Sequence, residues 1–381
     1  MHRFTLILQF LLLSLVSEAQ IILSSDAQIS LLTCDPGSEL YSTFGHTAIR
    51  VKDPEQKLDV AFNYGIFDFD TPGFYSKFLR GKLDYMLGAY PYDSFMHEYR
   101  RDKRSVTEQV LLLDSLKKQT LFDFLANNAK KENRYYKYDF FFDNCSTRPR
   151  DVFESVMDLQ LDKADIDKSF RDLLDEFLPG MPWADFGIDL VIGAVADQKA
   201  TEYHQTFLPE YLMTSLDQKE GFVANKKVII DHSKEREERF KASIFSPTLL
   251  FGLLLLLELI FLLLLKSKES RWINLYDKTW FIIMAFSSIV LLFMWFGTDH
   301  IATKQNWNLL WISPAYVLIP LIKDVNRRKQ LFFFLLGSNI LAVVSWTLIP
   351  QNYHQAFLPI MLIMIIKLWR HKDKQNKIGR A

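Results

Sequence analysis

The sequence predicts two structural parts, an α+β extracytoplasmic domain followed by an all-α membrane domain of five transmembrane helices. Three observations predict this division. The chain opens with a short apolar segment, residues 20–243 are mixed and charged, and residues 244–370 are dominated by Leu, Ile, Phe and Trp. The chain has 381 residues, which is long enough for two domains of about 100 to 200 residues each.

Residues 1–19 have the layout of a secretory signal peptide. Arg3 precedes an apolar core from Phe4 to Val16, and small residues around Ala19 allow cleavage after it. The apolar core is shorter than the roughly 20 residues that span a bilayer, although an uncleaved anchor is the alternative interpretation. In either case, residue 20 onward lies outside the cytoplasm.

Residues 20–243 carry the patterns of both strands and helices. Period-two alternation and turn residues predict strands over 47–51, 59–67 and 105–113, the first two of which are expected to pair. Apolar residues at helical spacing predict helices over 115–133, from Ser146 onward, over 169–178 and over 185–197. Residues 226–241 are expected to form a last polar helix or a linker.

The C-terminal part contains five apolar spans, at about 245–265, 275–296, 308–322, 331–349 and 356–369. The third and fifth are short, but neighbouring helices can bury their ends. The loops expected on the inside hold the basic residues Lys266, Lys268, Arg271, Lys323, Arg327, Arg328 and Lys329, and the tail adds six more. The two outside loops, 297–307 and 350–355, contain a single basic residue, Lys304, as the positive-inside rule requires.

Cys145 is the strongest candidate for chemistry in the outer domain. It stands where the helix from Ser146 begins, and the positive end of a helix dipole favours the nucleophilic thiolate. His46, beside Gly45 at the start of a strand, is the candidate base. Asn63 on the next strand is placed to orient the His46 ring. A structural histidine and an edge asparagine are the alternative interpretations.

Cys34 supports a competing interpretation. The chain has two cysteines, and in an oxidising compartment an isolated pair ordinarily forms a disulfide. A bridge between Cys34 and Cys145 would leave no thiol for catalysis. Counting cysteines leaves both interpretations open.

The first outside loop, residues 297–314, is rich in hydrogen-bonding side chains. His300, Asn306 and Asn308 are candidates for contact with a substrate at the membrane face. Asn308 begins the third span, where a polar group needs a partner because hydrocarbon offers none. An ordinary solvated loop is the alternative.

Several kinds of site have no signature in the sequence. The histidines lack the His-Glu-x-x-His spacing, and Cys-x-x-Cys, Gly-rich phosphate-binding and Gly-x-Ser-x-Gly motifs are missing. We therefore expect no metal and no cofactor. The formal net charge of zero averages two unlike halves, and we expect no nucleic-acid partner.

Several long motifs occur together in one order: LYSTFGHTAIRV, FNYGIFDF, FFFDNCSTRPRDVFE, FRDLL, PWADFGIDLVIGAVAD, FLPEYL and NLLW. This chain resembles the Lnb-type bacterial lipoprotein N-acyltransferases, which have an N-terminal periplasmic domain. The resemblance implies transfer of a fatty acyl chain from a membrane phospholipid to the α-amino group of diacylated lipoproteins. It also implies a protein of the cytoplasmic (inner) membrane with a cytoplasmic C-terminus.

Gly-His before a strand, followed later by Asn-Cys before a helix, is also similar to the permuted papain-like order of the lecithin retinol acyltransferase group. The resemblance implies Cys145 as nucleophile, His46 as base and Asn63 in the third position, where that group has a second histidine. Tyr64, Asn144 and Arg148 are expected to contact substrate. Arg148 would pair its N–H donors with the lipid phosphate, and an exposed helix arginine is the alternative.

Two other functions compete with acyl transfer. The first is a membrane-bound thiol hydrolase, either a phospholipase or a peptidase, that uses the same Cys-His pair. The second is a non-catalytic membrane assembly protein with a Cys34–Cys145 disulfide. Five spans are unnecessary for cutting cell wall, which favours lipid chemistry over a peptidase.

Overall fold

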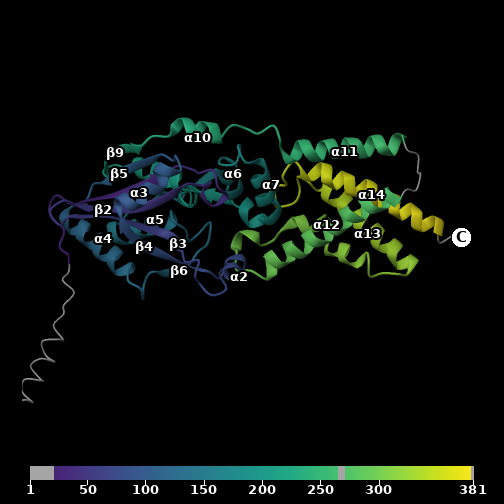
Figure 1. Ribbon diagram of the computed structural model, residues 1–381, viewed down its shortest axis with the longest axis horizontal. Coiled ribbons are helices and arrows are strands. Elements are labelled where there is room, and N and C mark those ends of the chain that lie inside the picture. The colour runs from purple at the N-terminus through teal and green to yellow at the C-terminus, as the bar shows by residue number, and fades with distance from the viewer. Residues whose placement is uncertain (1–20, 265–270, 379–381) are drawn as a thin grey trace, which may run out of the picture.

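The computed structural model describes residues 21–264 and 271–378, so the predicted signal peptide lies outside the described residues. Figure 1 shows an elongated molecule in which a mixed α/β domain and a bundle of long helices lie end to end. The chain passes from one part to the other between α10 (Ser233–Arg239) and α11 (Pro247–Leu264). This arrangement agrees with the predicted α+β domain and helical C-terminal region.

The N-terminal domain is built on a seven-stranded antiparallel sheet with the order β6-β4-β3-β2-β1-β5-β9. Its strands are β1 (Gln28–Cys34), β2 (His46–Asp53), β3 (Leu58–Phe67), β4 (Asp84–Pro91), β5 (Val106–Leu111), β6 (Tyr135–Lys137) and β9 (Val223–Ile230). The predicted pairing of the second and third strands is confirmed, with Ile49 opposite Phe62. Central β1 has no counterpart among the predicted strands.

Helices cover both faces of this sheet, because alternate residues of each strand point to opposite sides. On one face, α4 (Ser115–Asn128), α5 (Thr147–Met157) and α9 (Pro209–Asp217) pack on a buried core that includes Leu31, Ile49 and Phe62. On the other face, α3 (Tyr92–Arg101) covers Leu32, Ala48 and Ala61. The sheet is therefore a rigid central layer from which the site residues project.

The rest of the domain includes several short elements. They are α2 (Phe74–Leu79), β7 (Asp165–Ser169), α6 (Phe170–Asp175), α7 (Pro182–Val191), the 3-10 turn η2 (Ala194–Asp197), β8 (Lys199–Thr201) and α8 (Glu202–Gln205). The helix predicted over 185–197 is thus α7, which begins earlier and ends before Gly193, followed by a 3-10 turn. Phe186 and Leu190 of α7 pack on the core of the membrane helices.

The prediction of a polar helix or linker over residues 226–241 is wrong for residues 226–230. They belong to β9, which pairs with β5 at the edge of the sheet, and α10 follows only from Ser233. β-Branched residues at 228–230 favour a strand, and the available edge of β5 supplies its hydrogen bonds. Tertiary pairing therefore overrides the high local charge.

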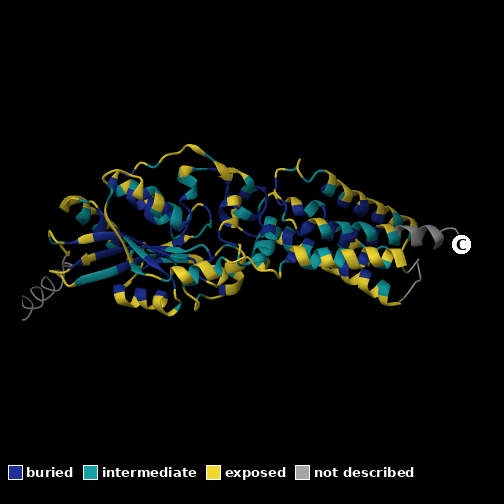
Figure 2. Cartoon of the chain, turned by 90° about the horizontal axis from the view of Figure 1, so that it is seen from above, coloured by how far each residue is buried: buried dark blue, intermediate teal, exposed yellow. Residues whose placement is uncertain are grey.

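The C-terminal part has four long helices: α11, α12 (Arg271–Phe296), α13 (Val325–Val344) and α14 (Phe357–Ile378). Among the described residues, α11 and α12 are long and apolar enough to cross a membrane by length and composition. Figure 2 shows exposed residues along the outer sides of the bundle. Many of these are large apolar side chains, such as Leu256 and Leu257 on α11, as a lipid-facing surface requires.

The structure differs from prediction at the third apolar span. Residues 307–318 form two 3-10 turns, η4 (Trp307–Leu310) and η5 (Pro314–Leu318), in place of an α-helix. The segment nevertheless runs antiparallel to α13, since Ser338 donates to the Leu310 carbonyl and Arg328 donates to the Ile322 carbonyl. Ser313 and Pro314 interrupt a continuous helix, and packing against α12 and α13 buries the irregular backbone.

A buried ionic cluster joins three of the long helices. Lys367 of α14 is fully buried and lies 3.2 Å from Glu258 of α11 and 2.9 Å from Asp277 of α12. Arg370 contacts both carboxylates, with its nearest nitrogen 2.6 Å from Asp277. Charges inside a helix bundle are stable only when paired, so this cluster fixes how α14 packs on its neighbours.

Candidate active site

Three elements bring the predicted reacting residues together. His46 begins β2, Asn63 lies on the adjacent strand β3, and Cys145 immediately precedes the first turn of α5. The position that a Cβ would take on Gly65 is 3.4 Å from the Cβ of Cys145 and 3.8 Å from Cε1 of His46. The cysteine and the histidine therefore lie against the same glycine.

Gly65 is a site residue that the sequence analysis did not identify. The register between β3 and β4 shifts between Asn63 and Ile66, and Gly65 has a φ of +93° within this bulge. A side chain here would require a rare backbone conformation and would press on Cys145. The bulge thus allows the loop that carries Cys145 to approach the strand that carries Asn63.

The His46 ring is oriented by Asn63. Nε2 of His46 lies 2.6 Å from Oδ1 of Asn63, an atom that can only accept, so Nε2 carries the proton and Nδ1 has the free lone pair. Burial lowers the pKa of His46 to about 4, because the buried site disfavours the charged ring more than the hydrogen bond to Asn63 favours it. His46 is therefore neutral at physiological pH, as a general base must be.

Cys145 is a partly exposed residue, and its thiol is protonated in the resting site. Burial raises its pKa to about 11, although the backbone N–H groups of Thr47 and Cys145 itself favour the thiolate. This result corrects the expectation that the helix start makes a thiolate, since desolvation outweighs the helix terminus here. The contact with the backbone of Thr47 places the thiol beside the residue that follows His46.

Asn144 caps the start of α5, and its role in substrate binding stays a prediction. Its Oδ1 accepts from the backbone N–H groups of Ser146 and Thr147 at 2.7 and 2.9 Å. Its Nδ2 donates to the carbonyls of Phe140 and Phe207, and the residue is 3% exposed. Asn144 is therefore the hydrogen-bond acceptor for the N–H groups of Ser146 and Thr147. The N–H groups that act on the Cys145 thiol are those of Thr47 and of Cys145 itself.

Cys34 and Cys145 are both free thiols. Cys34 is paired with His46 across β1 and β2, is 1% exposed and lies in the core beneath α3. Burial raises its pKa to about 12, which leaves it inert as a nucleophile. The two cysteines therefore have different environments, and only Cys145 is accessible.

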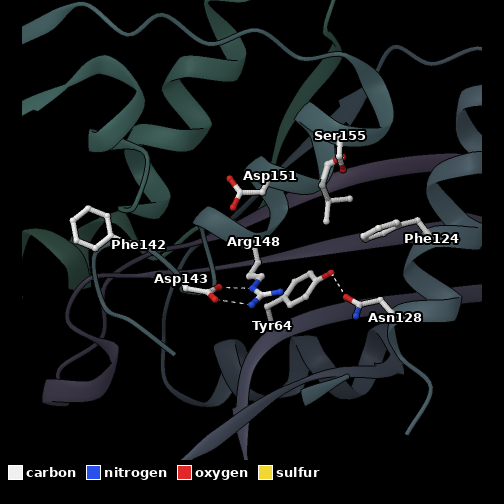
Figure 3. A pocket seen from close by; sticks show the side chains of 9 residues that line it. Tyr64, Phe124, Asn128, Phe142, Asp143, Arg148, Asp151 and Ser155 are labelled. Atoms are coloured by element: carbon white, nitrogen blue, oxygen red, sulfur yellow. Dashed lines mark hydrogen bonds and ion pairs between the residues drawn. The ribbon is translucent and has the colours of Figure 1, made fainter. Parts of the chain in front are cut away.

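Tyr64 and Arg148 line a cavity of about 480 Å³ between β3, α4 and α5 (Figure 3). The Tyr64 hydroxyl donates to Oδ1 of Asn128 at 2.7 Å, which uses its proton. Nε and Nη2 of Arg148 both donate to the Asp143 carboxylate, the latter at 2.6 Å, and the guanidinium lies 4.1 Å from the centre of the Tyr136 ring. Arg148 is thus neutralised within the chain and is not a free phosphate ligand.

Asn306 and Asn308 hold the membrane helices to the N-terminal domain. Nδ2 of Asn306 donates to the backbone carbonyls of Leu190 and Val191 at 2.9 Å each. Nδ2 of Asn308 donates to the backbone carbonyl of Asp189 at 3.0 Å. The two asparagines are at most 1% exposed. In the structure the two asparagines bind the last turn of α7, and their contact with substrate stays a prediction. His300 also contacts the domain, because its Nε2 donates to the Leu79 carbonyl at 3.2 Å.

An ionic group lies beside this junction. Arg171 of α6 is 2% exposed and pairs with Asp189 and with Asp197, the latter at 2.9 Å. Asp175, Asp185 and Asp189 each place one carboxylate oxygen within 4.8 Å of the others, a spacing that can hold a metal ion. Burial raises the pKa of Asp175 to about 7 and that of Asp189 to about 6. Because Arg171 already neutralises Asp189, we assign no metal here.

Two family models match the chain. Residues 19–177 match the family described as Lnb N-terminal periplasmic domain, and residues 238–375 match the family described as Lnb transmembrane domain. No curated protein and no solved structure matches. His46, Asn63, Gly65 and Cys145 all lie within the first matched region.

Proposed function

Because this chain belongs to the Lnb-type proteins, in which a periplasmic domain accompanies a transmembrane domain, we propose that it is a lipoprotein N-acyltransferase. Family membership indicates a membrane protein of lipoprotein maturation. In the proposed reaction, a fatty acyl chain passes from a membrane phospholipid through a thioester on Cys145 to the α-amino group of an N-terminal diacylglyceryl-cysteine. The observation that carries this chemistry is an accessible thiol next to a neutral, oriented histidine.

In the first step, Nδ1 of His46 accepts the thiol proton as the sulfur of Cys145 attacks the ester carbonyl carbon of the phospholipid. Because the pKa of Cys145 is raised and that of His46 is lowered, both residues are neutral in the resting site. The proton therefore moves to His46 during the attack, and no ion pair forms beforehand. The backbone N–H groups of Cys145 and Thr47 are the nearest donors for the oxyanion. The C–O bond then breaks, and His46 returns the proton to the leaving lysophospholipid oxygen.

In the second step, the neutral α-amine of the lipoprotein attacks the thioester carbonyl carbon. His46 accepts a proton from the attacking nitrogen, the C–S bond breaks, and the proton returns to the sulfur. The products are an amide and the free thiol, so no cofactor is consumed. A thioester suits this step because it reacts readily with amines.

The order of the reacting residues supports the permuted papain-like arrangement that we propose for the domain. His46 and Asn63 lie on adjacent strands, and Cys145 follows them before a helix. We also propose five membrane crossings, with residues 307–322 as a non-helical third crossing alongside α13. The domain would face the periplasm from the cytoplasmic (inner) membrane, with the C-terminus in the cytoplasm.

Reconstitution distinguishes this function from its nearest rival. The full-length chain in lipid nanodiscs is given phospholipid with a labelled acyl chain and a synthetic diacylated lipopeptide with a free N-terminus. Acyl transfer predicts labelled amide on the peptide and an equal amount of lysophospholipid, both lost in Cys145→Ala. Labelled free fatty acid without labelled peptide would instead identify a phospholipase.

A further inference from the structure

A cluster of aromatic side chains lies at the end of β3, in the segment that follows it and on α2. We call it the aromatic lip, and its members are Phe67, Phe69, Phe74, Tyr75 and Phe78. Their rings are in contact, with centroids 5.0 Å apart for Phe67 and Phe69 and 4.9 Å apart for Phe69 and Phe74. Phe74 anchors the cluster as the buried member of α2.

The outer members of the lip are exposed to an unusual degree. Phe69 is 69% exposed, Tyr75 is 82% exposed and Phe78 is 50% exposed, and the next residue, Leu79, is 51% exposed. These four large apolar side chains fall within 11 residues of sequence. Contiguous exposed apolar surface of this kind marks an interaction site more often than chance exposure.

The lip is attached to the end of a membrane helix. The N–H of Asp299 donates to the Arg80 carbonyl at 2.9 Å, and Nε2 of His300 donates to the Leu79 carbonyl. These two residues follow α12 closely, since α12 ends at Phe296. Figure 1 shows α2 beside this end of α12. The lip is therefore continuous with the membrane domain.

Both sides of this junction have the composition of a membrane interface. Trp295 and Phe296 stack at the end of α12, and Phe296 is 72% exposed, as in the aromatic belts of transmembrane helices. Lys77 lies within the lip, and Arg80 and Lys82 follow it in sequence, whereas the acidic residues Asp68 and Asp70 lie beside its first members. Basic side chains flanking exposed aromatics suit the headgroup region.

We propose that the aromatic lip is immersed in the outer leaflet of the membrane. The occupant of this apolar surface is lipid, and the lip gives the domain a membrane contact besides the transmembrane helices. β3 carries Asn63 and Gly65 before it reaches Phe67, so the leaflet begins close to the reacting residues. The proposal concerns membrane contact alone and holds whether or not the chain transfers acyl groups.

Depth-dependent quenching tests the proposal on the full-length chain in nanodiscs of phosphatidylethanolamine and phosphatidylglycerol. An environment-sensitive fluorophore is attached at Tyr75→Cys in a Cys145→Ser background, where the remaining cysteine, Cys34, is buried. The matched control is Leu116→Cys, because Leu116 is 78% exposed on α4 at the far end of the domain (Figure 1). A second probe at Phe78→Cys repeats the measurement.

If the lip is immersed, nitroxide lipids should quench the fluorescence of the probes at 75 and 78 at least about two-fold more than that of the probe at 116. The emission of the probes at 75 and 78 should also be blue-shifted. Equal quenching and equal emission at all three positions would overturn the proposal and would indicate a protein partner or solvent at the lip. Strong quenching at 116 as well would overturn it too, because contact would then not be specific to the lip. Thermal unfolding of each labelled chain verifies that it is folded.

Discussion

Two of the polar groups in the described part of the chain, one at the domain junction and one around Cys145, differ in how much of their hydrogen-bonding capacity is left unused. At the domain junction, Asn306, Asn308 and Arg171 direct their donors to backbone carbonyls and carboxylates. In the group formed by His46, Asn63 and Cys145, Nε2 of His46 is hydrogen-bonded to Asn63, while Nδ1 keeps a free lone pair. Cys145 is partly exposed. Saturated polar groups stabilise the fold, whereas unused capacity at an accessible position indicates chemistry.

The largest expected effect comes from removing the base. His46→Gln should lower the rate of lipopeptide acylation by about 10²- to 10⁴-fold, the usual contribution of a general base. The free energy of unfolding should change little by comparison. The rate is measured with labelled phospholipid in nanodiscs, and His97→Gln, on the exposed side of α3, serves as the matched control. A rate above a tenth of the wild-type value would remove His46 from the mechanism.

The next largest effect is on stability at the junction. Arg171→Ala leaves Asp189 and Asp197 buried without their cation, which should cost about 3–5 kcal/mol of unfolding free energy. Adding Asp197→Asn should recover part of this loss, because one uncompensated charge is removed. Thermal unfolding in nanodiscs measures both. A change below about 1 kcal/mol, the value typical of exposed pairs, would contradict the buried ion-pair network.

Asn63 should have a smaller effect than His46 because it acts through the orientation of the ring. Asn63→Leu should reduce the acylation rate by about tenfold to a hundredfold, as expected for a misplaced catalytic group. Asn63→Asp retains an acceptor for Nε2 and should keep more of the rate than Asn63→Leu. If the two variants are equally slow, the hydrogen bond to His46 is not what the reaction requires.

The smallest effect is a pH dependence of stability. The pKa of His46 is about 4 in the folded chain and about 6.5 when unfolded, so the unfolded chain binds more protons between these values. Stability from His46 is therefore present above pH 6.5 and is lost as the pH falls towards 4, by about 2 kcal/mol at pH 5. Comparing wild type with His46→Gln cancels the other titrating groups, and a parallel pH dependence of both would contradict the buried neutral ring.

The sequence patterns that predict His46, Asn63 and Cys145 as site residues are local. Gly45-His46 before a strand, Asn63 on the next strand and Cys145 before a helix are each recognisable from short patterns, and the pairing of β2 with β3 brings the first two together. Gly65 could not be found this way. Its importance arises from a bulge and from a loop that arrives 80 residues later in the chain, at Cys145.

The intramolecular partners of the polar residues predicted as substrate ligands could not be predicted from the sequence either. Asn308 binds the carbonyl of Asp189, and the two are 119 residues apart in sequence. Residue type and loop position cannot reveal such a distant partner. Arg148 and Asn144 have partners that are close in sequence: Arg148 donates to Asp143, and Asn144 accepts from the N–H groups at the helix start. The local sequence does not reveal that these bonds form. The 3-10 turns of residues 307–318 likewise depend on packing between α12 and α13.

The central claim is that Cys145 carries the acyl chain as a thioester. The most direct measurement incubates the full-length chain with acyl-labelled phospholipid without acceptor, quenches it with acid and examines its peptides by mass spectrometry. The account predicts label on the Cys145 peptide, released by hydroxylamine and transferred to the α-amine when diacylated lipopeptide is added. Labelled lipopeptide formed without any label on Cys145, or a Cys34–Cys145 disulfide in the active protein, would contradict it.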